Sequence, residues 1–121
     1  MFVLDTNIII YYAAGQPEIV EFFQKHKERT FYLPTIVVTE FLSFPLISPG
    51  TAYIFKRFAA QTTILDLDFA IAELAAELRR RYNLKLADAI IAATTLISNS
   101  ELITRNIKDF KKVIGLKLFK I

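Results

Sequence analysis

Short apolar runs recur along the chain, and each one stops at a polar residue or a turn residue. Runs of this kind, without alternation, are typical of strands that are buried on both faces of a parallel sheet. The pattern predicts five such strands, at Phe2–Leu4, Phe31–Leu33, Thr62–Leu65, Glu101–Thr104 and Leu116–Phe119.

Between the strands, apolar residues follow the three- and four-residue spacing of amphipathic helices. Strands that alternate with helices favour an α/β fold, in which helices cover both faces of a parallel sheet. We therefore expect one α/β domain over residues 1–121. The predicted helices are Ile8–Ala14, Pro17–Lys27, Ile36–Phe44, Thr51–Ala60, a long helix from an Asp66 or Asp68 cap to Tyr82, Leu86–Ser98 and Ile107–Val113.

The composition narrows the chemistry that this domain can perform. The chain has 121 residues, no Cys and one His, His26. These counts exclude a cysteine nucleophile, a Cys-ligated zinc site, an iron–sulfur cluster and a site built from several histidines. The most apolar stretches are well short of the ~18–20 residues that a membrane-spanning helix needs. The N-terminal segment MFVLDTNIII lacks the basic start of a signal peptide, so we expect a soluble, cytoplasmic protein without membrane contact.

The net charge is +3, and residues 61–121 hold all of the excess. The segment 102–121 alone has six basic residues and one acid. A basic excess fits a polyanionic partner such as nucleic acid. It also fits an ordinary solubilising surface, and charge alone does not decide between the two.

Three acids are embedded in apolar sequence, where an unpaired carboxylate costs several kcal/mol. Asp5 follows the first predicted strand, at the end where ligands bind in parallel sheets. Glu40 has Ile36 and Phe44 as its i−4 and i+4 neighbours, which predicts that it lies on the apolar face of its helix. Asp88 lies in the first turn of the helix LADAIIAATTLI.

Each acid also has a purely structural interpretation. Asp5 can cap the helix that follows it, Glu40 can extend from the helix edge, and Asp88 can favour the helix dipole. Asn106 and Asp109, which follow the fourth strand, are likewise common capping residues. The case for a site comes from the conjunction of acids in one small domain. Clustered carboxylates repel one another unless a cation neutralises them, and oxygen ligands suit Mg²⁺ or Mn²⁺. With basic residues nearby, the predicted reaction is metal-assisted hydrolysis of phosphodiesters.

Four segments, in order, resemble the PIN-domain ribonucleases, and most closely the VapC-type toxins of toxin–antitoxin pairs. They are FVLDTNIII, VVTEF, LADAIIAATTL and LITRNIKDF. The resemblance implies a three-layer α/β/α fold with a five-stranded parallel sheet. It also implies an endoribonuclease that depends on Mg²⁺ or Mn²⁺, a cognate antitoxin that inhibits it, and a homodimer.

Carried over residue by residue, the resemblance makes Asp5, Glu40 and Asp88 the three core acids of the catalytic metal site. Thr6 and Asn7 match the polar pair that orients the first carboxylate, and Thr104 matches the hydroxyl residue near the site. Family members often have Asp where this chain has Asn106, so either Asn106 or Asp109 fills the fourth metal position.

Other residues have roles that the sequence leaves open. Lys85 and Arg105 flank the acids and are the candidates for binding RNA. Tyr11 and Tyr12 either stack on unpaired bases or pack in the core. Two other functions stay possible: a degenerate PIN domain that binds RNA or protein without catalysis, and a phosphatase with Asp5 as its nucleophile. The phosphatase is disfavoured because Asn7 stands where such enzymes have a second Asp.

Overall fold

The computed structural model describes residues 1–121 and contains five strands and seven helices. The strands are β1 (Phe2–Leu4), β2 (Phe31–Pro34), β3 (Thr63–Leu65), β4 (Glu101–Ile103) and β5 (Lys117–Phe119). The helices are α1 (Thr6–Ala13), α2 (Pro17–Lys25), α3 (Thr35–Leu42), α4 (Pro49–Ala59), α5 (Phe69–Tyr82), α6 (Leu86–Ile97) and α7 (Ile107–Phe110).

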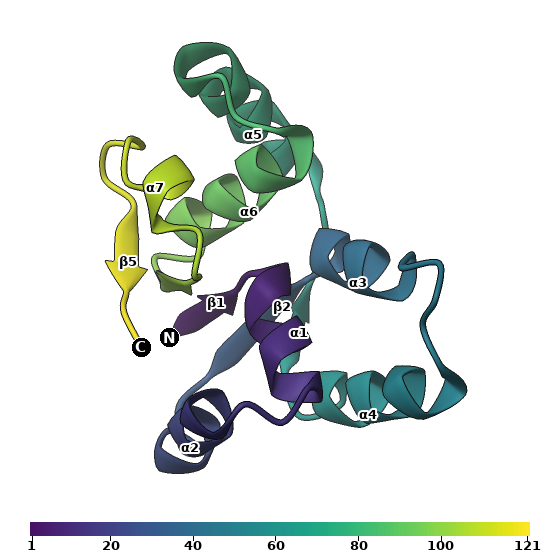
Figure 1. The fold of residues 1–121 in the computed structure, drawn as a ribbon. Helices are drawn as coiled ribbons and strands as arrows, with labels where there is room; N and C mark the ends of the chain where they lie inside the picture. The colour runs from purple at the N-terminus through teal and green to yellow at the C-terminus, as the bar shows by residue number, and fades with distance from the viewer.

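The strands form one sheet in the order β3-β2-β1-β4-β5, and every pairing is parallel. Figure 1 shows α5, α6 and α7 together on one side of β1 and β2, with α1, α2 and α4 on the other. The predicted α/β fold, with helices on both faces of a five-stranded parallel sheet, is therefore confirmed. Because all strands run the same way, their carboxyl ends meet at one edge of the sheet.

The strand at the centre of this sheet is β1, which pairs with β2 on one side and β4 on the other. Val3 lies opposite Tyr32 of β2 and Leu102 of β4. All three residues of β1 are fully buried, which explains why its sequence is a continuous apolar run. The residue that follows this run is Asp5, which therefore lies at the carboxyl end of the central strand.

The predicted elements are confirmed, but several of their boundaries differ by one to three residues. Pro34 is the last residue of β2 and has extended backbone angles. Proline has no N–H to donate to a neighbouring strand, and it is therefore tolerated at the end of a strand. Helix α5 ends at Tyr82, because the next residue, Asn83, has a positive φ of 54° that does not continue the helix. Helix α7 ends at Phe110, three residues earlier than predicted.

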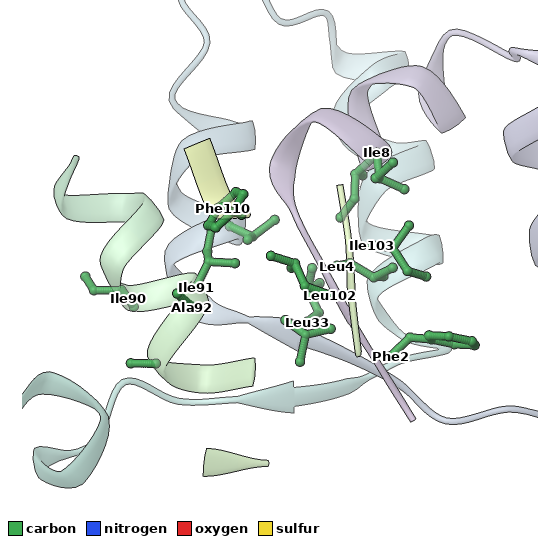
Figure 2. Packing of buried hydrophobic residues seen from close by; sticks show 14 of the residues in the cluster. Phe2, Leu4, Ile8, Leu33, Ile90, Ile91, Ala92, Leu102, Ile103 and Phe110 are labelled. Carbon is green, nitrogen blue, oxygen red and sulfur yellow. The ribbon is translucent and has the colours of Figure 1, made fainter. Parts of the chain in front are cut away.

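The core is one continuous cluster of 25 buried hydrophobic residues. Figure 2 shows Leu4, Leu33 and Leu102, from three neighbouring strands, gathered together, with Ile91 of α6 beside them. This packing fixes the sheet against α6 and so holds the carboxyl end of β1 in place. None of the helices has the length and hydropathy that crossing a membrane requires.

Candidate active site

Asp5 lies where β1 ends and α1 begins, and it is only 5% exposed. Its Oδ1 accepts a hydrogen bond of 2.8 Å from the backbone N–H of Thr6, so Asp5 caps α1. Its own backbone N–H donates to the carbonyl of Ile103, which ties it to the end of β4. Capping is therefore one role of Asp5, and it leaves Oδ2 directed at the neighbouring strand end.

Two side chains donate hydrogen bonds to Oδ2 of Asp5. Thr104, directly after β4, donates from Oγ1 at 2.6 Å, and Asn7 donates from Nδ2 at 3.3 Å. Thr104 is itself buried and accepts hydrogen bonds from the backbone N–H of Asn106 and from Asn7. Thr104 reaches Asp5 because β1 and β4 are neighbouring strands that end at the same edge of the sheet.

The side chain of Glu40 is exposed, and it lines a groove whose other lining residues are mostly apolar. Of its apolar neighbours, Ile36 is partly buried and packs against the core, whereas Phe44 is largely exposed and lines the same groove. The Oε1 atom of Glu40 accepts a hydrogen bond of 2.6 Å from the hydroxyl of Thr6. Thr6 thus orients two acids: its N–H contacts Asp5 and its side chain contacts Glu40.

Asp88 is half-buried in the first turn of α6. Burial raises the pKa of its carboxyl, and the negative charges of Glu40 and Asp109 raise it further. The positive charges of Lys85 and Lys112 act in the opposite direction. These effects place two acids and two lysines around Asp88. One of the lysines, Lys112, lies 24 residues along the chain from Asp88, so no local sequence pattern connects the two.

Burial raises the pKa of Asp5 from 3.8 to about 6. The hydrogen bonds from Thr104 and Thr6 favour the carboxylate and lower the pKa, whereas the charges of Asp88 and Glu40 raise it. Desolvation is the largest effect, because the charged form of a buried carboxyl has lost its water. The structure thus brings Asp5, Glu40 and Asp88 close enough to repel one another.

Asn106 and Asp109 lie at the edge of the same region and contact each other. The amide of Asn106 donates from Nδ2 to Oδ2 of Asp109 at 3.0 Å. Asp109 is near enough to Asp88 to raise its pKa. Either residue can therefore supply an oxygen on the side of the site formed by α6 and α7.

The donor set fits a hard divalent cation. The groups near Asp5 are carboxylate and amide oxygens, the ligands that Mg²⁺ and Mn²⁺ prefer, and the repulsion among the acids favours a positive charge between them. No three His, Cys, Asp or Glu side chains are close enough together to hold an ion by themselves. Mg²⁺ is commonly bound by one or two carboxylates with water and substrate oxygens, so a three-acid cage is not required.

Of the two predicted RNA-binding cations, Lys85 lies near the acids and Arg105 is engaged elsewhere. Lys85 is exposed at the start of α6, three residues before Asp88. The guanidinium of Arg105 pairs with Glu18 of α2 at 2.5 Å. The backbone N–H of Arg105 donates to Oδ1 of Asn7, so its main chain is fixed beside the site.

A groove of about 320 Å³ opens next to Glu40, between α1 and α3. Several apolar side chains that line it are exposed, among them Phe44 at 61%. Monomeric proteins rarely leave such a surface uncovered, so the groove is a candidate contact for another chain. Its apolar lining includes Ile10, Ala13, Phe41, Phe44, Leu46 and Ile47.

Comparison with known proteins identifies the family. The family model described as PIN domain matches residues 2–116. A toxin–antitoxin complex from Klebsiella pneumoniae contains a chain that is 30% identical to this one, with a TM-score of 0.81 and 100% of both chains covered. VapBC2 from Rickettsia felis, bound to promoter DNA, gives a TM-score of 0.87 at 23% identity, covering 99% of this chain and 98% of that one. DNA-bound VapBC from Salmonella typhimurium gives a TM-score of 0.84 at 24% identity, and the match covers 98% of this chain and 96% of that one. No curated protein matches the sequence.

Proposed function

The chain belongs to the PIN domain family, and on that premise we propose that it is a metal-dependent endoribonuclease of the VapC toxin type. It hydrolyses RNA phosphodiester bonds with Mg²⁺ or Mn²⁺, and a cognate antitoxin inhibits it. We propose that residues 1–121 form one PIN domain. A 30% identical chain in a toxin–antitoxin complex supports the toxin assignment.

The observation that carries this proposal is the state of Asp5. A buried carboxyl with a pKa of about 6 and two acidic neighbours is an unfavourable arrangement for the protein alone. Perturbed carboxyls at the end of a strand in an α/β fold are typical of functional sites. A divalent cation bound between these carboxylates would neutralise their repulsion and so stabilise the arrangement.

The residues of the site then have distinct roles. Asp5 and Asp88 would hold the cation, with Glu40 positioning the attacking water and Asn106 or Asp109 completing the ligand set. The bound cation supplies Lewis-acid activation of the water and stabilises charge on the phosphate. Thr104 and Asn7 fix the Asp5 carboxylate, and Thr6 fixes Glu40. Lys85 would bind a phosphate of the RNA beside Asp88.

For the antitoxin we propose the apolar groove between α1 and α3. The groove reaches Glu40, so a segment lying in it would also cover one wall of the acidic site. Apolar helices or extended segments commonly bind in grooves of this kind. Inhibition by steric cover is therefore consistent with the position of the groove.

For the homodimer we propose the face formed by α5, α6 and the loop before α5. Phe69 is 81% exposed there, and Leu67 and Leu86 are also exposed around a second hollow. Exposed apolar side chains grouped in this way are typical of a surface that a partner covers. This face and the groove are formed by different helices, so both partners can bind together.

A second candidate function is supported by one observation. Because no three acids are close enough together to hold an ion, the domain could bind RNA or protein without cleaving it. The two candidates differ in metal dependence. A binding module retains RNA in EDTA and never cuts it.

The first test is incubation of the partner-free protein with total cellular RNA. We expect discrete fragments with Mg²⁺ or Mn²⁺ and none with EDTA, because the acids need a cation to act on a phosphodiester. The products are resolved by gel electrophoresis and end mapping. An Asp5→Asn variant purified in the same way controls for contaminating nuclease. RNA that stays intact although metal binding is detected would favour the binding module.

A further inference from the structure

Arg105 has an interaction that the catalytic proposal does not explain. Its guanidinium is paired with Oε1 of Glu18, at the start of α2, at a distance of 2.5 Å. The same guanidinium lies over the ring of Tyr11, 5.4 Å from the ring centroid. The free protein therefore holds Arg105 in place through one acid and one aromatic ring.

The backbone of Arg105 connects this cation directly to the site. Arg105 directly follows Thr104, whose hydroxyl donates to Asp5. The backbone N–H of Arg105 donates to Oδ1 of Asn7. Asn7 and Tyr11 are one turn apart on α1, so they lie on the same side of that helix. Arg105 thus contacts Asn7 through its main chain and Tyr11 through its guanidinium, both on the side of α1 that borders the site.

The partner of Arg105 is easy to displace. Glu18 and Arg105 are both partly exposed, with 61% and 37% of their side chains accessible. Exposed ion pairs are weak, whereas an arginine can bind a phosphate through two parallel hydrogen bonds. The Tyr11 ring stays beneath the guanidinium after Glu18 leaves, so the arginine keeps its orientation.

We propose that Arg105 binds a substrate phosphate next to the cleaved bond, and that Glu18 is the exchangeable counter-ion that occupies Arg105 until RNA displaces it. The inference rests on the proposed function, because it assigns part of the RNA site. Glu18 is a positioning residue that acts through Arg105. It lowers affinity for RNA and takes no part in the chemical step.

The test is the substitution Glu18→Gln, with Glu21→Gln as the matched control. Glu21 lies on the same helix, is also 61% exposed and also forms an ion pair, with Lys25. The probe is a fluorescein-labelled, mixed-sequence, single-stranded RNA, and its Kd is measured by anisotropy in EDTA. For an RNA that the protein cleaves, KM and kcat are measured with Mg²⁺.

We expect Glu18→Gln to lower Kd and KM by about 2–5-fold, the range that an exposed ion pair allows, without a matching change in kcat. Glu21→Gln leaves Kd unchanged. In an Arg105→Ala background, Glu18→Gln has no effect, because the residue it acts through is gone. Arg105→Ala alone makes the slope of log Kd against log salt shallower by about 0.7, the value for one phosphate on a single strand.

Three results would overturn this inference without affecting the nuclease proposal. Equal effects of Glu18→Gln and Glu21→Gln on Kd would show that the affinity for RNA depends only on the net charge of the protein. An effect that persists in Arg105→Ala would show that Glu18 does not act through Arg105. An unchanged Kd in Glu18→Gln, with wild-type cleavage intact, would reject the inference and leave the nuclease proposal standing. If the wild type neither binds nor cleaves RNA, both proposals fail.

Discussion

Replacement of Asp5 by Asn is expected to reduce RNA cleavage by about 100-fold or more while making the metal-free protein more stable. Loss of residues that only support a metal ligand costs about 10–100-fold, so loss of the ligand itself costs at least as much. The gain in stability has a separate cause. At pH 7 the folded wild type must ionise a buried carboxyl whose pKa is about 6, and Asn carries no charge.

The pH dependence of the free energy of unfolding follows from the same pKa of Asp5. Unfolding returns the pKa of Asp5 from about 6 to near 3.8, so between these values the folded state binds more protons. The free energy of unfolding therefore falls as pH rises through this window, by about 1.4 kcal/mol per unit and about 3 kcal/mol in all. Urea unfolding in EDTA, at several pH values between 4 and 7, measures this slope.

Asp68→Asn is the matched control. Asp68 also caps a helix, since its Oδ1 accepts from the N–H of Ile71 at 2.9 Å, but it is exposed and far along the chain from the acids. We expect little change in stability or cleavage for this variant, because Asn caps helices as well as Asp does. A loss of stability in Asp5→Asn at pH 7 would contradict the electrostatic account.

Replacement of Thr104 by Val is expected to lower stability by about 1–3 kcal/mol and cleavage by about 10–100-fold. The hydroxyl of Thr104 donates to Asp5 and accepts from the N–H of Asn106, and the residue is 3% exposed. Valine has a similar shape, so the change removes these hydrogen bonds, leaving the N–H of Asn106 without its acceptor and Oδ2 of Asp5 with only the longer hydrogen bond from Asn7. Thermal unfolding and single-turnover cleavage measure the two effects.

Thr94→Val separates this effect from the loss of any buried hydroxyl. Thr94 is equally buried, at 2%, but its hydroxyl only donates to the carbonyl of Ile90 within α6. The carbonyl of Ile90 is already part of the helix, so removing the Thr94 hydroxyl that donates to it changes the stability little. If Thr94→Val and Thr104→Val had the same effect on cleavage, Thr104 would have no special role at the site.

The elements of this fold were predictable from local sequence patterns. The uninterrupted apolar run of β1 indicated a strand buried on both faces, and Asp5 directly after it indicated a strand end with a cap. Both conclusions depend on spacing within a few residues, where side-chain periodicity is fixed by the backbone. The same local logic placed Glu40 among apolar residues without deciding its exposure, because apolar neighbours on a helix can face a groove as well as a core.

The sequence by itself determined which residues could form strands, helices and an acidic site, because hydrophobic period and capping act over one or two turns of chain. Only the tertiary structure decided which of these residues meet. The contacts of Thr104 with Asp5, of Thr6 with Glu40 and of Arg105 with Glu18 join residues 99, 34 and 87 positions apart. They exist because β4 pairs beside β1 and because α1 packs against α2 and α3. Strand order and helix packing are set by burial of the whole core, which no local spacing encodes.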